Sequence, residues 1–181
     1  MSWHDQGVPS LLTERLTLRP FDAGDADALF DLMSRPEVAR WSGNGRPMVD
    51  RSEADGRIER MPVRQGDHPA AGILAVVPDG AERPVGMALL VPIPASAGFA
   101  RHDLEIGWHL HADAWGHGYA TEAAHALIDR AWAAGVPELY AVTHPDNVAS
   151  QAVCGRLGMT DLWLRGDWYD KELRAFRLGR P

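Results

Sequence analysis

At residues 115–123 the chain reads Trp-Gly-His-Gly-Tyr-Ala-Thr-Glu-Ala, two glycines followed by the start of an amphipathic helix. Glycine tolerates positive φ angles and lets a ligand approach the backbone closely. The residues after the glycines present the unpaired amides of a first helical turn, which attract an anion. The pattern therefore predicts a phosphate-binding turn, and a purely structural turn is the alternative.

Two common phosphate-binding motifs describe this turn poorly. A loop that binds nucleoside triphosphates has a Gly-Lys-Ser or Gly-Lys-Thr sequence, and no such lysine follows here. A dinucleotide fingerprint has a third glycine at the position of Thr121. The flanking segments are more informative than the glycines.

The segment before the turn predicts a strand. Residues 103–111 alternate apolar and polar side chains, which is typical of a strand with one buried face. The residues expected on the buried face are Leu104, Ile106, Trp108 and Leu110.

The segment after the turn predicts a helix and a second strand. Apolar residues recur at helical spacing over residues 120–132, and Gly135 is a typical helix end. Residues 138–142 read as a short strand. Together these elements predict a right-handed βαβ unit with its ligand at the carboxyl end of the first strand.

Length and composition predict one globular domain over residues 1–181. Residues 83–91 read as a further strand and residues 51–60 as a further helix. No apolar run has the roughly 20 residues of a membrane span, and residues 1–5 lack an export signal. One cysteine, Cys154, excludes an internal disulfide. We therefore expect a cytoplasmic protein with no membrane partner.

The net charge of -7 argues against nonspecific binding of nucleic acid. It favours, weakly, a cationic or amine-bearing acceptor.

Four segments resemble the GNAT superfamily of acyl-coenzyme A-dependent N-acetyltransferases, specifically the RimJ/RimL-type branch related to ribosomal-protein N-terminal acetyltransferases. They are residues 12–20, 105–123, 147–159 and 166–178, which cover nearly the whole chain in the family's order. The resemblance implies an α/β GNAT fold, in which a central, mostly antiparallel sheet splays at one parallel strand pair and carries helices on both faces. It also implies acetyl-coenzyme A (acetyl-CoA) as the cofactor.

The resemblance further implies which residues bind the coenzyme. Backbone amides of the glycine turn hold the pyrophosphate, the end of the preceding strand pairs with the pantetheine arm, and the start of the helix at residue 147 contacts the coenzyme. For the last of these, helix capping alone is the alternative. The residues are His109, Leu110, His111, Gly116, His117, Gly118, Tyr119, Ala120, Thr121, Asn147 and Ser150. Asp113 departs from the family, which often has Gln or Arg at that position.

Two side chains are candidates for catalysis. Glu105 lies on the polar face of the predicted strand, where family members use a carboxylate to take the proton of the amine; a solvent-facing or ion-paired glutamate is the alternative. Cys154 stands where the family often has a tyrosine that protonates the leaving thiolate. A small buried apolar residue is the alternative for this cysteine. A backbone amide near His109 or Leu110 is expected to stabilise the oxyanion.

Histidines raise the question of a metal site. His109 and His111 share a strand face, but a third ligand at a defined spacing is missing, so we predict no metal site.

The acceptor is expected to enter between residues 41–48 and 165–170. There Trp41, Trp168 and Tyr169 could cover it, and Asp167 or Asp170 could pair with its ammonium group. A homodimer surface or the edge of the core is the alternative for these aromatic residues.

The sequence thus predicts an enzyme that moves an acetyl group from acetyl-CoA to a primary amine, on a small molecule or a protein N-terminus. Two alternatives remain: a non-catalytic CoA-binding sensor or partner protein, and an acyltransferase that uses a bulkier donor such as succinyl-CoA.

Overall fold

The computed structural model describes residues 8–181, so the expectation drawn from residues 1–5 falls outside it. Residues 8–181 form eight strands, five α-helices and two short 3-10 helices. In order they are β1 (Leu11–Leu12), β2 (Leu16–Pro20), η1 (Ala23–Asp25), α1 (Ala26–Ser34), α2 (Pro36–Ala39), α3 (Arg51–Gln65), β3 (Gly72–Pro78), β4 (Gly86–Pro92), β5 (Leu104–Leu110), η2 (Ala112–Ala114), α4 (Tyr119–Ala133), β6 (Glu138–Thr143), α5 (Val148–Arg156), β7 (Thr160–Arg165) and β8 (Leu173–Gly179).

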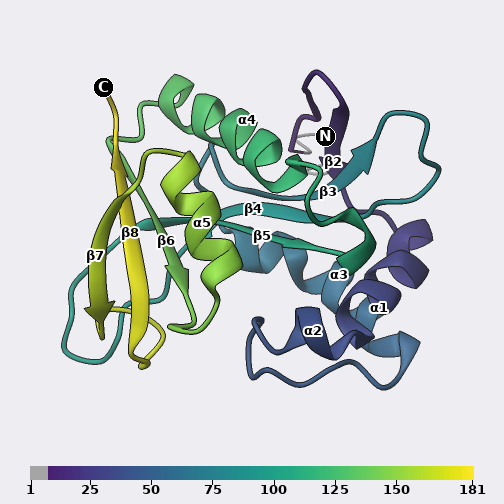
Figure 1. The fold of residues 1–181 in the computed structure, drawn as a ribbon, viewed down its shortest axis with the longest axis horizontal. Helices are drawn as coiled ribbons and strands as arrows, with labels where there is room; N and C mark the ends of the chain where they lie inside the picture. Colours follow the sequence, from purple (N-terminus) through teal and green to yellow (C-terminus); the bar gives the residue numbers. More distant parts are fainter. Residues whose placement is uncertain (1–7) are drawn as a thin grey trace, which may run out of the picture.

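All eight strands form one sheet in the order β1-β2-β3-β4-β5-β6-β8-β7. Every neighbouring pair is antiparallel except β5 and β6, which are parallel and joined through α4. The predicted class, a mixed and mostly antiparallel sheet with one parallel pair and helices on both faces, is confirmed. Figure 1 shows α4 and α5 on one side of the sheet and α1 and α3 on the other.

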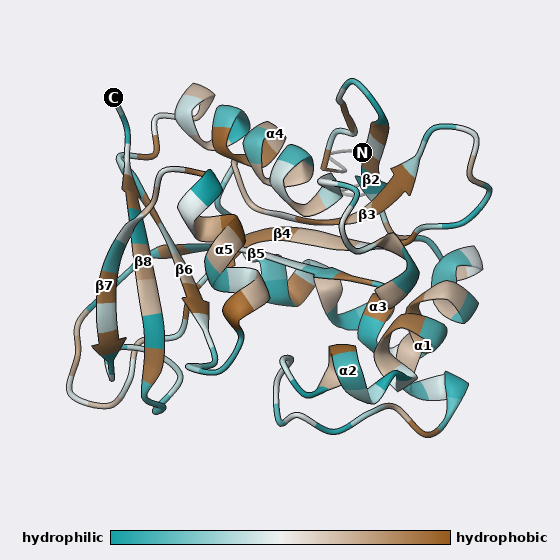
Figure 2. Ribbon diagram, in the orientation of Figure 1, coloured by the Kyte–Doolittle hydropathy of each residue, from teal (hydrophilic) through white to brown (hydrophobic). Residues whose placement is uncertain are grey.

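Each helical layer buries its own apolar cluster against the sheet. Helices α4 and α5 pack residues such as Leu127 and Val153 against Leu90 and Ile106. On the other face, α1 and α3 pack against a second cluster on β3 and β4. Figure 2 shows apolar residues along β3 and on helix faces turned toward the sheet. The sheet therefore separates two faces, and β5 contributes alternate side chains to each.

The parallel strands β5 and β6 touch at one end and then diverge. Their register consists of a single pair, Glu105 with Tyr140, whereas β4 and β5 stay paired from Gly86 and Leu110 to Pro92 and Leu104. Figure 1 shows β6 running at an angle to β5 beyond this point. Consequently the edge of β5 after Glu105 has no neighbouring strand, which leaves backbone groups free for a ligand.

The first family-like segment, residues 12–20, is divided between two strands in the structure. Residues 13–15 separate β1 from β2, and their polar groups bind the Glu122 carboxylate of α4. Thr13 Oγ1 donates to Glu122 at 2.6 Å, and Arg15 makes two side-chain hydrogen bonds to the same carboxylate at 2.8 and 2.6 Å. Two of the four family-like segments are thus bound directly to each other.

The sequence did not predict β3 and β7, and the helix predicted over residues 51–60 continues to Gln65. Strand β3 is buried on both faces, so its apolar run lacks the alternation that indicates a strand. Strand β7 is an exposed edge strand with a register shift between Asp161 and Leu164, where Trp163 has a φ of 62°. Within residues 8–181, every helix is too short or too polar to cross a membrane.

Candidate active site

The glycine turn forms a row of unpaired amides. Gly116 and Gly118 have φ angles of 79° and 82°, and Gly118 is the N-cap of α4. The first helical hydrogen bond runs from Glu122 N to Gly118 O at 3.0 Å. In the part of the chain that the structure describes, the six amides of residues 116–121 donate to no protein acceptor. This geometry can hold an anion.

One cation that the sequence analysis missed lies beside this row. Arg156, at the end of α5, donates from Nε to Thr121 Oγ1 at 3.3 Å and is exposed. Arg156 and Thr121 are 35 residues apart, so only the packing of α5 beside α4 could have indicated the contact. The guanidinium adds a positive charge where the helix dipole already favours an anion.

The free edge of β5 presents alternate residues. His111 N donates to Val85 O at 2.8 Å, and Asp103 O accepts from Ile93 N at 3.0 Å, so the backbone groups of odd-numbered residues face β4. Because backbone groups alternate along a strand, Trp108 and Leu110 face the opening toward β6. Leu110 O already accepts from Trp115 Nε1 at 2.9 Å, which leaves the Leu110 amide and both groups of Trp108.

This alternation corrects the predicted pantetheine contacts. The His111 amide is hydrogen-bonded to Val85, the residue before β4, and the backbone groups of His109 also face β4. Neither backbone is therefore available to a ligand in the gap between β5 and β6. Contact of Leu110 with the coenzyme stays a prediction. Trp108 is a further candidate because its backbone faces the same opening, and the strand period of two was the signal that could have found it.

Asn147 and Ser150 lie at the start of α5. Asn147 Oδ1 accepts from Ser150 N at 3.2 Å, which is the capping interaction given as the alternative for these residues. Contact of these residues with a coenzyme stays a prediction.

Cys154 is fully buried in the cluster beneath α4 and α5. Burial raises the pKa of its thiol to about 12. A thiol in that position fits the apolar alternative, and it is poorly suited to give a proton to a group in the gap.

Glu105 lies on the opposite face of the sheet, at the point where β5 and β6 diverge. Its side chain is 13% exposed and accepts a short hydrogen bond from the Tyr169 hydroxyl. Arg64 of α3 donates from Nη2 to Tyr169 Oη at 2.7 Å and lies 3.7 Å from Glu105 Oε2. Burial raises the pKa of Glu105, whereas the Tyr169 hydrogen bond and the Arg64 charge lower it. The carboxylate is therefore ion-paired, but it is held in a partly dry site rather than in solvent.

Tyr169 is held in place by a strained turn. Tyr169 and Asp170 have φ angles of 60° and 50°, unusual for residues with a Cβ. Hydrogen bonds to residues 94–97 fix this backbone: Tyr169 N donates to Pro94 O at 3.0 Å, and Asp170 N to Ser96 Oγ at 2.9 Å. Asp170 Oδ1 also accepts from Ala97 N at 2.8 Å. Strain of this kind is typical of functional sites.

Two residues predicted to meet the acceptor have structural roles instead. Trp168 is 1% exposed and donates from Nε1 to Asp103 at 2.9 Å, so it is at the core edge, as the alternative proposed. Asp167 is buried between Arg165 at 2.8 Å and Arg101 at 3.3 Å. Neither side chain is free to cover or bind an acceptor.

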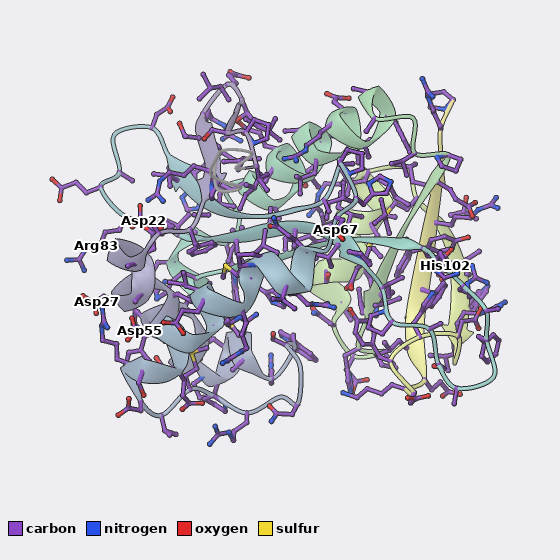
Figure 3. All side chains as sticks on the ribbon, turned by 180° about the vertical axis from the view of Figure 1, so that it is seen from behind. Asp22, Asp27, Asp55, Asp67, Arg83 and His102 are labelled. Atoms are coloured by element: carbon purple, nitrogen blue, oxygen red, sulfur yellow. The ribbon has the colours of Figure 1, made fainter. Side chains whose placement is uncertain are left out.

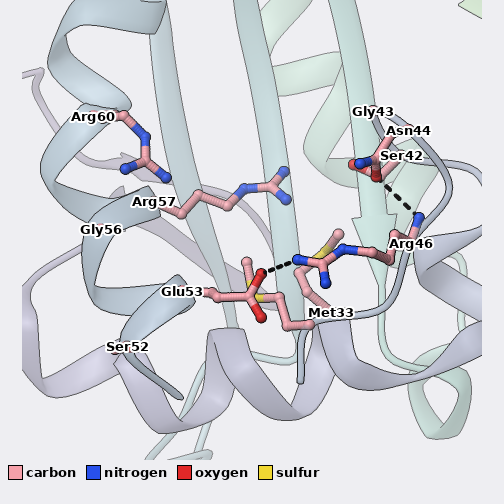
Figure 4. Close-up of a pocket in the computed structure, with 11 residues that line it drawn as sticks. Met33, Ser42, Gly43, Asn44, Arg46, Ser52, Glu53, Gly56, Arg57 and Arg60 are labelled. Atoms are coloured by element: carbon pink, nitrogen blue, oxygen red, sulfur yellow. Dashed lines mark hydrogen bonds and ion pairs between the residues drawn. The ribbon is translucent and has the colours of Figure 1, made fainter. Parts of the chain in front are cut away.

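A cavity of about 420 Å³ lies between α3 and the loop after α2. Figure 4 shows Arg57 extending from α3 across this cavity, with Arg60 one turn further along the helix. Arg46 of the loop pairs with Glu53 at 2.7 Å. On β5, burial and the charge of Arg57 lower the pKa of His109 to about 4, so this imidazole is neutral at pH 7. Sequence analysis gave no role to Arg57, Arg60 or Arg64.

The histidines of residues 8–181 form no common site. His102 is exposed beside the C-terminal strands, as Figure 3 shows from behind the molecule, whereas His111 lies near Asp31 of α1 at 3.3 Å. Among the residues that the structure describes, no three His, Cys, Asp or Glu side chains form a group that could hold a metal ion.

Comparisons with known proteins place this geometry in a family. The family model described as acetyltransferase (GNAT) domain matches residues 15–160. An uncharacterized N-acetyltransferase, p20, from Bacillus licheniformis is 32% identical over 144 residues, which cover 79% of this chain and 78% of p20. The crystal structure of an acetyltransferase from Agrobacterium tumefaciens is 29% identical and superposes with a TM-score of 0.77 over 96% of both chains.

A structure solved with a coenzyme A derivative is also among the similar structures. RimJ from Mycobacterium smegmatis, solved in complex with CoA-disulfide, has a TM-score of 0.73 over 94% of this chain and 86% of its own. Its sequence identity is 18%, so this likeness shows the shared fold.

Proposed function

The chain belongs to the acetyltransferase (GNAT) domain family, and from that premise we propose that it acetylates a primary amine with Glu105 as the general base. It is an acetyltransferase, and the cofactor of its family is acetyl-CoA. One observation carries the proposal for Glu105: its carboxylate lies at the single point where β5 and β6 still pair, next to the opening between them.

The residues present fit coenzyme A, which has a pyrophosphate and an arm with two amides. The six amides of residues 116–121, with Arg156 beside them, suit the pyrophosphate. The free backbone groups of Trp108 and Leu110 suit the amides of the arm. Asn147 and Ser150 lie on the other side of the gap, at the start of α5. Acetyl-CoA, when bound, supplies an acetyl group activated as a thioester.

Glu105 is suited to take a proton from the incoming ammonium group, directly or through one water molecule. A raised pKa brings the carboxylate closer to neutral pH, where a general base is most effective. Tyr169 and Arg64 hold its orientation.

The amides of Trp108 and Leu110 are candidates to stabilise negative charge on the acyl oxygen, because they face the gap and need no reorganisation. We assign no side-chain acid. The Cys154 thiol is in the core, and a departing thiolate with an ordinary pKa of about 8.5 needs no strong acid near neutral pH.

Calorimetric titration with acetyl-CoA tests the donor site first, with free CoA, NAD and ATP as comparators. We expect saturable binding of acetyl-CoA and CoA, and no comparable binding of NAD or ATP. Binding of NAD or ATP alone, or of none of the four, would reduce the glycine turn to a structural element and overturn the proposal.

A panel of primary amines, analysed by mass spectrometry for a gain of one acetyl group, then tests turnover. Small-molecule amines and a peptide N-terminus belong in the panel, because both acceptor classes fit the proposal. A CoA-binding sensor would bind acetyl-CoA and acetylate nothing. A preference for succinyl-CoA in direct competition would instead indicate a bulkier natural donor.

A further inference from the structure

Helix α3 presents three arginines along one face. Arg57, Arg60 and Arg64 are separated by three and four residues, which places them on the same side of a helix. Arg57 and Arg60 line the cavity of about 420 Å³, and Arg64 contacts the Glu105 site. The acceptor face of the sheet is thus bordered by a row of cations.

In the described part of the chain, Arg57 has no anionic partner. Its Nη2 contacts Met87 Sδ at 3.8 Å, and within residues 8–181 no carboxylate forms an ion pair with Arg57 or Arg60. The acid that lines the same cavity, Glu53, is committed to Arg46 and to the backbone amide of Val49. Burial, with the nearby charges of Arg64 and Arg60, lowers the pKa of Arg57. A partly buried cation without a counterion is costly for a protein, which makes Arg57 a candidate to bind an anionic ligand.

The position of Arg57 relative to the base can be obtained from the strand register. Arg57 contacts Met87, which pairs with His109, whereas Glu105 pairs with Val91. Four residues along β5 correspond to about 13 Å. Since His109 is neutral at pH 7, the charge at that end of the face comes from the arginines. A small molecule can span the distance between the two sites.

We propose that the acceptor is a small amine with a carboxylate or phosphate group at its other end, which Arg57 binds with help from Arg60 while the amine faces Glu105. This rests on the proposed acetyltransferase function and names its substrate class. The net charge of -7 favoured a cationic acceptor, whereas this proposal gives the acceptor an anionic group. The reason is that the acceptor meets the local positive charge of the cavity rather than the charge of the whole chain.

Calorimetry on the protein saturated with free CoA tests the proposal without requiring turnover. The ligands are ω-amino carboxylates of increasing length, aminoalkylphosphonates of the same lengths, and the neutral amides of the carboxylates. We expect the best anionic ligand to bind at least roughly tenfold more tightly than its neutral counterpart, the order expected for a hydrogen bond to a charged group. The better of the two anion types identifies the group that the cavity accepts.

Arg57→Met removes the charge, and Arg180→Met, in the exposed C-terminal tail, is the matched control. The proposal predicts that Arg57→Met abolishes the preference for the anionic ligand, whereas Arg180→Met keeps it. Arg57→Met should also raise the melting temperature of the unliganded protein, because it removes a partly buried charge that forms no ion pair within residues 8–181. A merely structural arginine would lower the melting temperature when replaced. If Arg57→Met fails to fold, Arg60→Met, on an exposed residue, must weaken the preference severalfold.

Equal binding of anionic and neutral ligands, or no binding of any anionic ligand at millimolar concentration, would overturn the substrate class. Binding of acetyl-CoA and acetylation of a neutral amine would then still support the proposed function. Loss of acetyl-CoA binding in the parent protein would instead count against the proposed function itself.

Discussion

The two halves of the candidate site are built from different parts of the chain. The donor half consists of backbone groups on nearly contiguous sequence: the amides of residues 116–121 and the free edge of β5 at Trp108 and Leu110. The acceptor half consists of side chains from three separate elements, Glu105 of β5, the arginines of α3 and Tyr169 of the turn before β8. If the proposed roles hold, backbone groups recognise the cofactor of the family, whereas side chains from distant elements determine the reaction and the substrate.

Glu105→Gln is expected to have the largest effect, and to affect catalysis without affecting binding of the donor. The amide cannot accept the proton of the amine, so kcat should fall by roughly 10²- to 10³-fold, the range for loss of a general base. Affinity for acetyl-CoA should stay unchanged, because Glu105 is on the acceptor face. Steady-state kinetics and calorimetry measure the two effects.

Glu138→Gln is the matched control for that variant. Glu138 is also a strand carboxylate bonded to a tyrosine hydroxyl, but its partner is Tyr140 at 2.7 Å. It should keep kcat within a fewfold of the parent. Equal losses of kcat in both variants, or a parallel loss of acetyl-CoA affinity in Glu105→Gln, would contradict the division into two halves.

Gly116→Ala tests the donor half and should have a smaller effect. At a φ of 79° an added Cβ meets no atom within 4 Å, so the change adds backbone strain without a clash. Strain of about 1 kcal/mol should shift the turn from its binding geometry and weaken acetyl-CoA roughly fivefold to tenfold. Selectivity among acceptor amines should not change, as the panel of amines would show.

Gly135→Ala provides the comparison for that strain. Gly135 follows α4, has the same φ of 79° and likewise has nothing within 4 Å of a built Cβ. Both variants should lose similar stability in urea unfolding, but only Gly116→Ala should lose affinity. Similar affinities in the two variants would mean that the turn does not bind the coenzyme.

The donor half could be predicted from the sequence because its signals are local. The glycines, the helix that follows and the alternating strand before it lie within about 35 residues, and the predicted βαβ unit is present as β5, α4 and β6. Some predicted contacts were wrong because they ignored that backbone groups point alternately to the two sides of a strand. His109 and His111 were assigned to the ligand although their backbone groups face β4.

The acceptor half could not be predicted, because its contacts join residues far apart in sequence. Tyr169 meets Glu105 across 64 positions, and the turn that holds it depends on residues 94–97. Trp168 and Asp167 were predicted to meet the substrate because of their loop position. In the structure Trp168 packs in the core and bonds to Asp103, whereas Asp167 pairs with Arg101 and Arg165. Arg57 could not be singled out from the sequence, because it differs from other arginines only in forming no ion pair within residues 8–181.

Tyr169→Phe should have the smallest effect and sharpens the comparison most finely. The Tyr169 hydroxyl stays protonated, since burial and the Glu105 charge raise its pKa, and the hydrogen bond it donates lowers the pKa of Glu105. Its loss therefore raises the pKa of the base. Because the reaction requires ionised Glu105, activity is lost as pH falls through that pKa, so the acidic limb of kcat/KM should move to higher pH by roughly half a unit to one unit. The maximal rate should change only severalfold. Tyr140→Phe removes a hydroxyl bonded to Glu138 and should leave the limb in place. An unmoved limb in Tyr169→Phe would mean that Glu105 is not the group whose ionisation limits the rate, and the acceptor half would need another base.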